Sequence, residues 1–202
     1  MALTRIVTLR EPIAFIIALT AISLTVGSRY LVFGPIIFFP IVAASVSLAF
    51  LPHELMHRYI ARKMGCFSRF VLDPFGLMLT LATAIPFIPF KIIIPGYVLI
   101  SSHYYDPITR KRIEGVSAIA GPLTNLVIAL IGIVLLNTVA LLIANQYLNI
   151  FLLYLIIVNA WIAFFNLLPI PPLDGSKIIS WKPINWALLF TLSIILLFLY
   201  WF

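Results

Sequence analysis

The chain of 202 residues is 63% hydrophobic and only 9% charged, with a mean hydropathy of +1.17. Soluble domains carry about 25% charged residues, so this composition excludes a soluble fold and indicates a polytopic membrane protein in contact with a lipid bilayer. The net charge of +7 does not indicate a nucleic-acid partner, because the 13 Lys and Arg residues lie in short groups beside apolar segments.

Five apolar segments are long enough to cross a bilayer. We expect membrane helices over residues 12–28, 35–64, 116–144, 147–168 and 184–202, and the chain enters the second of them near Leu31. Pro40 and Pro52 predict kinks in the second span. We expect residues 1–202 to form a single transmembrane domain.

Residues 70–100 lie between the second and third spans and are apolar, yet they contain Pro86, Pro89, Pro95 and Lys91. These residues would break or strand a membrane helix. The pattern favours a short membrane-associated β or re-entrant region, and a kinked sixth helix is the alternative. The predicted fold class is therefore an all-α polytopic membrane protein with about five to six transmembrane helices.

Basic residues should gather at one end of these spans if residues 70–115 do not cross the membrane. They precede the first, third and fifth spans and follow the second: Arg5, Arg10, Arg58, Arg62, Lys63, Arg69, Arg110, Lys111, Arg112, Lys177 and Lys182. The positive-inside rule then predicts a multi-pass protein of the cell membrane, with its N-terminus and this end of the spans on the cytoplasmic side.

The second span ends in the motif HELMH, residues 53–57. His53 and His57 are four residues apart, so they share a helix face on which they could hold one metal ion. Glu54 is angled toward the same pocket and could take a proton from water. Because ionisable groups at bilayer depth are costly and usually functional, we interpret the motif as a zinc site rather than a solvated helix end.

A catalytic zinc site requires a third protein ligand. The acidic and histidine candidates are Glu11, Asp73, His103, Asp106, Glu114 and Asp174. The first five fit a helix start, a turn or a solvated loop. Asp174 follows the helix-breaking run PIPP and precedes Gly175, which permits a tight backbone. By this reasoning Asp174 suits a metal ligand and a turn residue equally.

Asparagines mark two of the spans. Asn159 and Asn166 share a face of the fourth span, where an amide can join helices. Asn166 could equally donate to a developing oxyanion or to a substrate backbone. In the third span, Gly121, Pro122 and Asn125 should give structural support beside the site, through close helix approach and a kink.

The motifs HELMH, GPLTN and NLLPIPPLDG together resemble those of the site-2 protease family of intramembrane zinc metalloproteases, over residues 35 to about 180. The resemblance implies one zinc ion per chain, held by His53, His57 and Asp174, with Glu54 as general base and acid. It also implies that Asn166 contacts the substrate or oxyanion.

The same resemblance implies that residues 76–100 form a strand layer that receives an unwound substrate. Residues 63–115 are too few for the inserted PDZ module of some members, so the chain resembles the compact form.

The sequence therefore predicts a zinc-dependent intramembrane endopeptidase that cleaves transmembrane segments of membrane-tethered proteins, as in regulated intramembrane proteolysis. Its expected partner is a membrane-spanning protein substrate. The alternative is a non-catalytic membrane protein that binds or transports metal, which would use the ligands but would not need Glu54. A membrane di-iron oxygenase would need more ligands than 3 histidines supply.

Overall fold

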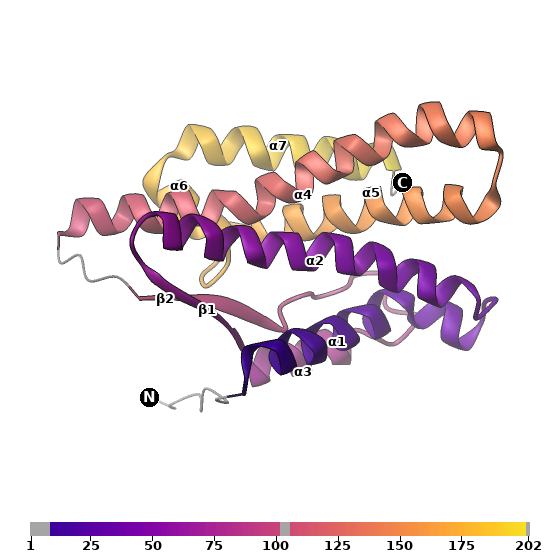
Figure 1. The fold of residues 1–202 in the computed structure, drawn as a ribbon, viewed down its shortest axis with the longest axis horizontal. Coiled ribbons are helices and arrows are strands. Elements are labelled where there is room, and N and C mark those ends of the chain that lie inside the picture. The colour runs from indigo at the N-terminus through magenta and orange to yellow at the C-terminus, as the bar shows by residue number, and fades with distance from the viewer. Residues whose placement is uncertain (1–8, 102–105, 201–202) are drawn as a thin grey trace.

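The structure is a computed structural model, and it describes residues 9–101 and 106–200. Its elements are drawn in Figure 1. In chain order they are α1 (Glu11–Val32), α2 (Phe38–Lys63), β1 (Phe67–Leu72), α3 (Pro74–Ala82), β2 (Gly96–Ser101), α4 (Pro107–Ile143), α5 (Gln146–Asn166), α6 (Asp174–Trp181) and α7 (Pro183–Tyr200).

Five of these helices, α1, α2, α4, α5 and α7, are long and apolar enough to cross a membrane. The remaining helices are short, and the two strands form one small sheet. The protein is thus an all-α polytopic membrane protein, as the composition predicts. Within the described residues, the segment between α2 and α4 adds no sixth helix of membrane-spanning length.

The first two spans meet at a different place from the expected one. α1 continues beyond residue 28 to Val32, and a short turn leads to α2 at Phe38. Pro40 therefore falls in the first turn of α2, where a proline removes no intrahelical hydrogen bond. The predicted kink at Pro40 has no basis there, whereas Pro52 lies inside the helix.

The segment between α2 and α4 contains a helix where extended chain was expected. Asp73 caps α3 by accepting a hydrogen bond from the Gly76 amide at 2.9 Å, and Pro74 occupies the first helical position. This pair overrides the strand tendency of the apolar residues that follow. The prediction of extended structure is therefore wrong for Pro74–Ala82.

Strand structure in this segment is confined to β1 and β2. They pair antiparallel from Phe67 opposite Ser101 to Leu72 opposite Gly96. The chain from α3 to β2 is irregular, and Lys91 Nζ donates to the carbonyls of Thr83 and Ile85 at 2.8 and 3.0 Å. Partial burial holds the pKa of this lysine below its usual value.

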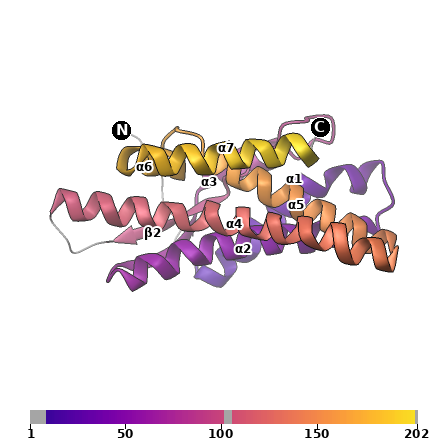
Figure 2. The same cartoon turned by 90° about the horizontal axis from the view of Figure 1, so that it is seen from above.

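Helix α2 lies at the centre of the molecule, between α4 and α5 on one side and α1 and the sheet on the other (Figure 1). α4 also packs against α6, and it lies between α6 and α2 in Figure 2. α4 begins at Pro107, before the expected start at residue 116, because its charged first turns continue the apolar helix outward.

Candidate metal centre

The HELMH motif lies in the C-terminal half of α2. His53, Glu54 and His57 are all buried, with 2%, 7% and 6% of their surfaces exposed. The helix continues through the motif to Lys63, so the two histidines stack one turn apart. Their Nε2 atoms lie 3.0 Å from each other.

Asp174 completes a cluster with these histidines. It is the first residue of α6, which follows the irregular segment after α5. Its Oδ2 atom lies 3.0 Å from His57 Nε2 and 3.6 Å from His53 Nε2. The three ligand atoms lie within 4.8 Å of one another, and this is a group of described residues that could hold a metal ion.

Two glycines make this approach possible. A Cβ atom at Gly175 would collide with the carbonyl of Leu167, so only glycine lets the start of α6 lie this close to the end of α5. A Cβ atom at Gly121 would lie 2.7 Å from His53 Cε1 and still closer to the His57 ring. Gly121 of α4 thus leaves the space in which both imidazoles lie.

The other ring nitrogen of each histidine is held by α4. His53 Nδ1 lies 2.5 Å from Asn125 Oδ1, and His57 Nδ1 lies 2.7 Å from the carbonyl oxygen of Ser117. A carbonyl oxygen can only accept, so His57 must donate from Nδ1. Its Nε2 atom then carries a lone pair, as a metal ligand requires.

A chain of amides sets the tautomer of His53 in the same way. Asn159 donates from Nδ2 to the Leu155 carbonyl at 2.8 Å, so its Oδ1 atom accepts from Asn125 Nδ2, also at 2.8 Å. Asn125 Nδ2 donates to the Ala49 carbonyl as well, so Asn125 Oδ1 faces His53 as an acceptor. His53 must therefore donate from Nδ1, which leaves the lone pair on its Nε2 atom.

Three electron-pair donors consequently face one another: two Nε2 atoms and Asp174 Oδ2. Lone pairs at 3.0 to 3.6 Å repel without a cation between them. The donor set therefore fits a zinc ion, which takes imidazole and carboxylate ligands.

Glu54 lies beside this cluster, and its Oε2 atom is buried without a hydrogen-bond partner among the described residues. Lys177, one turn after Asp174, places Nζ 3.7 Å from Asp174 Oδ1. Ser117 and Lys177 were not among the residues that the sequence predicted for the site. The spacing of Lys177 three residues from Asp174 on a helix was the available signal, whereas a backbone acceptor such as Ser117 leaves no mark in the sequence.

The other candidates for a third ligand have different partners. Glu11 accepts from Arg58 Nη1 at 3.1 Å and from the Phe70 amide at 2.6 Å. Asp73 caps α3, Asp106 accepts from the Thr109 amide at the start of α4, and Glu114 pairs with Arg110. His103 lies outside the described residues.

Asn166 and Pro122 flank the site without a direct contact to the cluster in the described interactions. Asn166 ends α5, and its Nδ2 atom donates to the Ile162 carbonyl of its own helix at 2.9 Å. Pro122 lies inside α4, next to Gly121. Asn159 joins α5 to α4 through Asn125, which agrees with the expected interhelical role of that amide.

Buried histidines and a carboxylate at the meeting point of membrane-spanning helices define a membrane protein with a candidate metal centre. The chain is 37% identical over 153 residues to "Putative zinc metalloprotease MJ0611" of Methanocaldococcus jannaschii, a match that covers 76% of each chain. It is 30% identical over 169 residues to "Putative zinc metalloprotease YwhC" of Bacillus subtilis, over 72% of this chain and 70% of the other.

These similarities show that the chain belongs to a family of zinc metalloproteases. No protein-family model matches the chain, and no solved structure matches it with statistical significance.

Proposed function

We propose that this protein is a zinc-dependent intramembrane endopeptidase of the site-2 protease type, which cleaves a transmembrane segment of a membrane-tethered protein. The position of the site along a helix of membrane-spanning length is the observation that carries the proposal. His53 and His57 lie 10 and 6 residues before the end of α2 at Lys63. At a rise of about 1.5 Å per residue, they lie roughly 9 to 15 Å from that helix end, a distance that supports a site within the hydrocarbon layer.

His53, His57 and Asp174 would hold one zinc ion per chain. When bound, zinc supplies a Lewis acid that makes water a nucleophile at neutral pH and polarises the scissile carbonyl. Glu54 would act as the general base, because its unpartnered Oε2 atom is free to accept the proton of the attacking water. The same carboxyl group would then return that proton to the leaving nitrogen.

Asn166 would contact the substrate backbone or the developing oxyanion. Its amide lies at the last residue of α5, directly before the irregular segment that leads to Asp174. The Nδ2 group carries two hydrogens, so it can keep its bond to the Ile162 carbonyl and donate the second hydrogen to the substrate.

The sheet offers one edge to an unwound substrate. On β1, the Ser68 carbonyl accepts from Arg62 and the Phe70 amide donates to Glu11, so side chains of α2 and α1 already cover the outer edge of β1. The backbone N–H and C=O groups of successive residues point to opposite sides of a strand. On β1, those of Phe67, Arg69 and Val71 therefore point toward β2.

The same alternation on β2 points the backbone groups of Val98 and Ile100 away from β1. A substrate strand could pair there and recover the hydrogen bonds that it loses when its helix unwinds. The substrate class we propose is accordingly a single membrane-spanning segment with helix-weakening residues near the cleavage site.

A cleavage assay with a catalytic variant tests this function. The substrates are single-span fusion proteins that carry either a Gly-Pro pair in the middle of the span or an unbroken leucine span. We expect wild type in detergent to cut the Gly-Pro span and to contain about one zinc per chain by elemental mass spectrometry. Glu54→Gln should keep the zinc but lower the rate by at least about 100-fold.

Two ligand variants complete the experiment, since Asp174→Ala and His57→Ala should lose both zinc and cleavage. Cleavage by Glu54→Gln at the wild-type rate would contradict the role of the base. Zinc binding with no cleavage of either span by wild type would favour the non-catalytic alternative, a metal-binding or transport protein that has no need for Glu54.

A further inference from the structure

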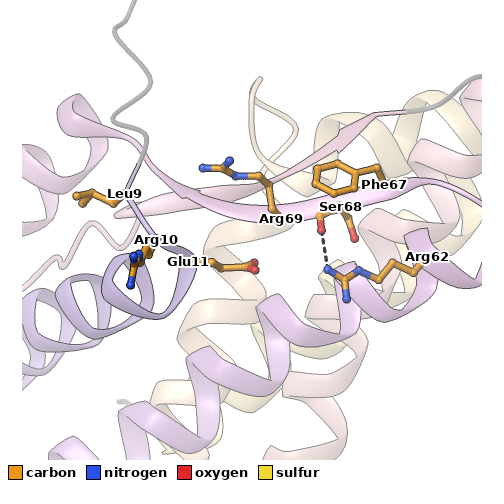
Figure 3. A pocket seen from close by; sticks show the side chains of 7 residues that line it. All are labelled: Leu9, Arg10, Glu11, Arg62, Phe67, Ser68 and Arg69. Carbon is orange, nitrogen blue, oxygen red and sulfur yellow. Dashed lines mark hydrogen bonds between the residues drawn. The ribbon is translucent and has the colours of Figure 1, made fainter.

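A cavity lies away from the metal centre, where α1 begins and α2 ends (Figure 3). Its volume is about 400 Å³, within the range of small-molecule sites. The lining comes from the residues that lead into α1, from the last turn of α2 and from β1: Leu9, Arg10, Glu11, Arg62, Phe67, Ser68 and Arg69. None of these residues belongs to the metal-binding group.

The position of this arginine cavity along the spans is that of lipid headgroups. α1 begins at Glu11 and α2 ends at Lys63, and both are helices of membrane-spanning length. A cavity at the shared end of two such helices lies where the hydrocarbon layer gives way to phosphates.

The charges around the cavity do not balance. Arg10, Arg62 and Arg69 line it, and Glu11 is the one acidic residue in the lining. That carboxylate is already engaged by Arg58, which lies outside the lining, and by the Phe70 amide. The three lining guanidinium groups are therefore left without an anionic partner among the described residues of the cavity.

Donor groups also remain available there. Arg62 donates from Nη2 to the Ser68 carbonyl at 2.9 Å (Figure 3). The other N–H groups of this guanidinium remain available to a ligand. Arg69 Nε is buried and has no hydrogen-bond partner among the described residues. A buried cationic donor without a hydrogen bond raises the free energy of the folded protein, and an acceptor bound there would remove this cost.

We propose that this cavity binds the phosphate of an anionic phospholipid headgroup. Arginine forks match phosphate oxygens in bidentate geometry, and several of them can share one phosphate group. The wall also contains Phe67, 59% exposed, and Leu9. Apolar groups beside the arginines suit the glycerol and upper acyl region of a lipid, whereas a free phosphate ion would gain nothing from them.

The bound headgroup would connect three elements. Arg10 precedes α1, Arg62 belongs to the last turn of α2 and Arg69 belongs to β1. The proposed lipid site shares no residue with the proposed catalytic site. A test of lipid binding is therefore independent of the proposed proteolytic function.

Native mass spectrometry of the full chain tests the site. Protein in detergent is titrated with phosphatidylglycerol, with phosphatidylcholine of the same acyl chains, and with inorganic phosphate. The test variant is Arg10→Gln with Arg69→Gln, because neither side chain makes a hydrogen bond or ion pair within the described part of the chain. The control, Lys111→Gln with Arg112→Gln, removes the same charge from exposed positions at the start of α4.

We expect wild type to prefer phosphatidylglycerol to phosphatidylcholine. The test variant should bind phosphatidylglycerol roughly 30-fold more weakly, since each of the two basic residues contributes about a fivefold factor to the affinity for an anionic lipid. The affinity of the control variant for phosphatidylglycerol should fall by less than about threefold, because exposed charges are screened by salt. Melting temperatures of both variants identify any that fail to fold, and the lipid preference of wild type stands as a test on its own.

Three outcomes would overturn the proposal. The first is wild type that binds both lipids equally. The second is a test variant that loses no more affinity than the control, which would indicate general surface charge. The third is inorganic phosphate that displaces the lipid completely at equal concentration, which would make the ligand a soluble anion.

Discussion

At the scale of single residues, the candidate metal centre depends on groups that never touch the metal position. Asn159 and Asn125 form a directional chain of hydrogen bonds that starts at the Leu155 carbonyl and ends at His53 Nδ1. All three of these side chains are at most 2% exposed. The chain fixes which nitrogen of His53 carries its proton, so we regard Asn125 as a positioning residue.

Replacement of Asn125 tests this role. Asn125→Leu keeps the volume of the side chain but cannot accept the His53 proton, so zinc affinity should fall about 10- to 100-fold. Competition with a zinc-chelating dye measures the affinity.

Asn137→Leu is the matched control for this variant, since its amide lies on the same helix and is exposed, and bonds only its own helix at the Ile133 carbonyl. Equal zinc affinity in the Asn125 variant, the control and wild type would show that the amide chain does not position the ligand.

The residues of the site differ in how far the sequence alone could assign them. Residues four apart on any helix share one face, so the motif alone predicts that the imidazoles of His53 and His57 lie side by side. Asp174 was equally compatible with a turn, and only the resemblance made it a ligand. The structure brings it to the histidines through the close approach at Gly175, which depends on tertiary packing. Backbone contacts such as that of Ser117 are not encoded by residue type.

At the scale of elements, the sheet and its neighbours decide where a substrate could pair. The outer edge of β1 is closed by Arg62 and Glu11, so the outward groups of β2 are those available within the described sheet. The proposed pairing therefore depends on the backbone N–H of Val98 and can be blocked without loss of the ladder to β1.

Val98→Pro removes that N–H group and adds a ring on the outward edge. We expect cleavage of the Gly-Pro span to fall about tenfold, because a hydrogen bond to the substrate is lost and its strand is held away. The control Val98→Thr keeps the N–H group and should cleave at the wild-type rate. Zinc content should stay the same in both variants. If Val98→Pro cleaved normally, the substrate would have to pair elsewhere.

The same region shows where element prediction from sequence failed. Its prolines correctly argued against a membrane-spanning helix, because Pro86, Pro89 and Pro95 lie close together and would each remove a helix hydrogen bond. The short helix α3 was missed because Asp73 before Pro74 was interpreted as a turn, although the same pair is also a helix start. The strand β1 begins before the expected region, at Phe67, where pairing with β2 stabilises it.

At the scale of the whole molecule, basic residues gather at one end. α1 and α4 begin at this end, α2 ends there, and α6 and α7 follow one another there (Figure 1). Arg29, near the end of α1, is an exception, and so is Lys91, which lines the same cavity as Arg29. By the positive-inside rule we propose that the basic end, which is also the end nearer the metal centre, lies in the cytoplasm.

Cysteine labelling in intact cells checks this orientation. In a Cys66→Ser background, the chain carries a single new cysteine, either Lys111→Cys at the start of α4 or Tyr147→Cys at the start of α5. A membrane-impermeant maleimide should label the cysteine at position 147 in intact cells, and the one at position 111 only after the cells are opened. The reverse pattern would invert the proposed topology.

The separation of the ligands along the chain has a consequence for how the protein is made. His57 and Asp174 are 117 residues apart, and α4 and α5 are inserted between them. A nascent chain that has delivered only α2 to the membrane holds two imidazoles but no carboxylate from α6, so it has an incomplete ligand set. Synthesis order therefore delays the complete centre until four of the five spans found in the described residues are in place, and unfinished chains would lack the proposed activity toward their neighbours in the membrane.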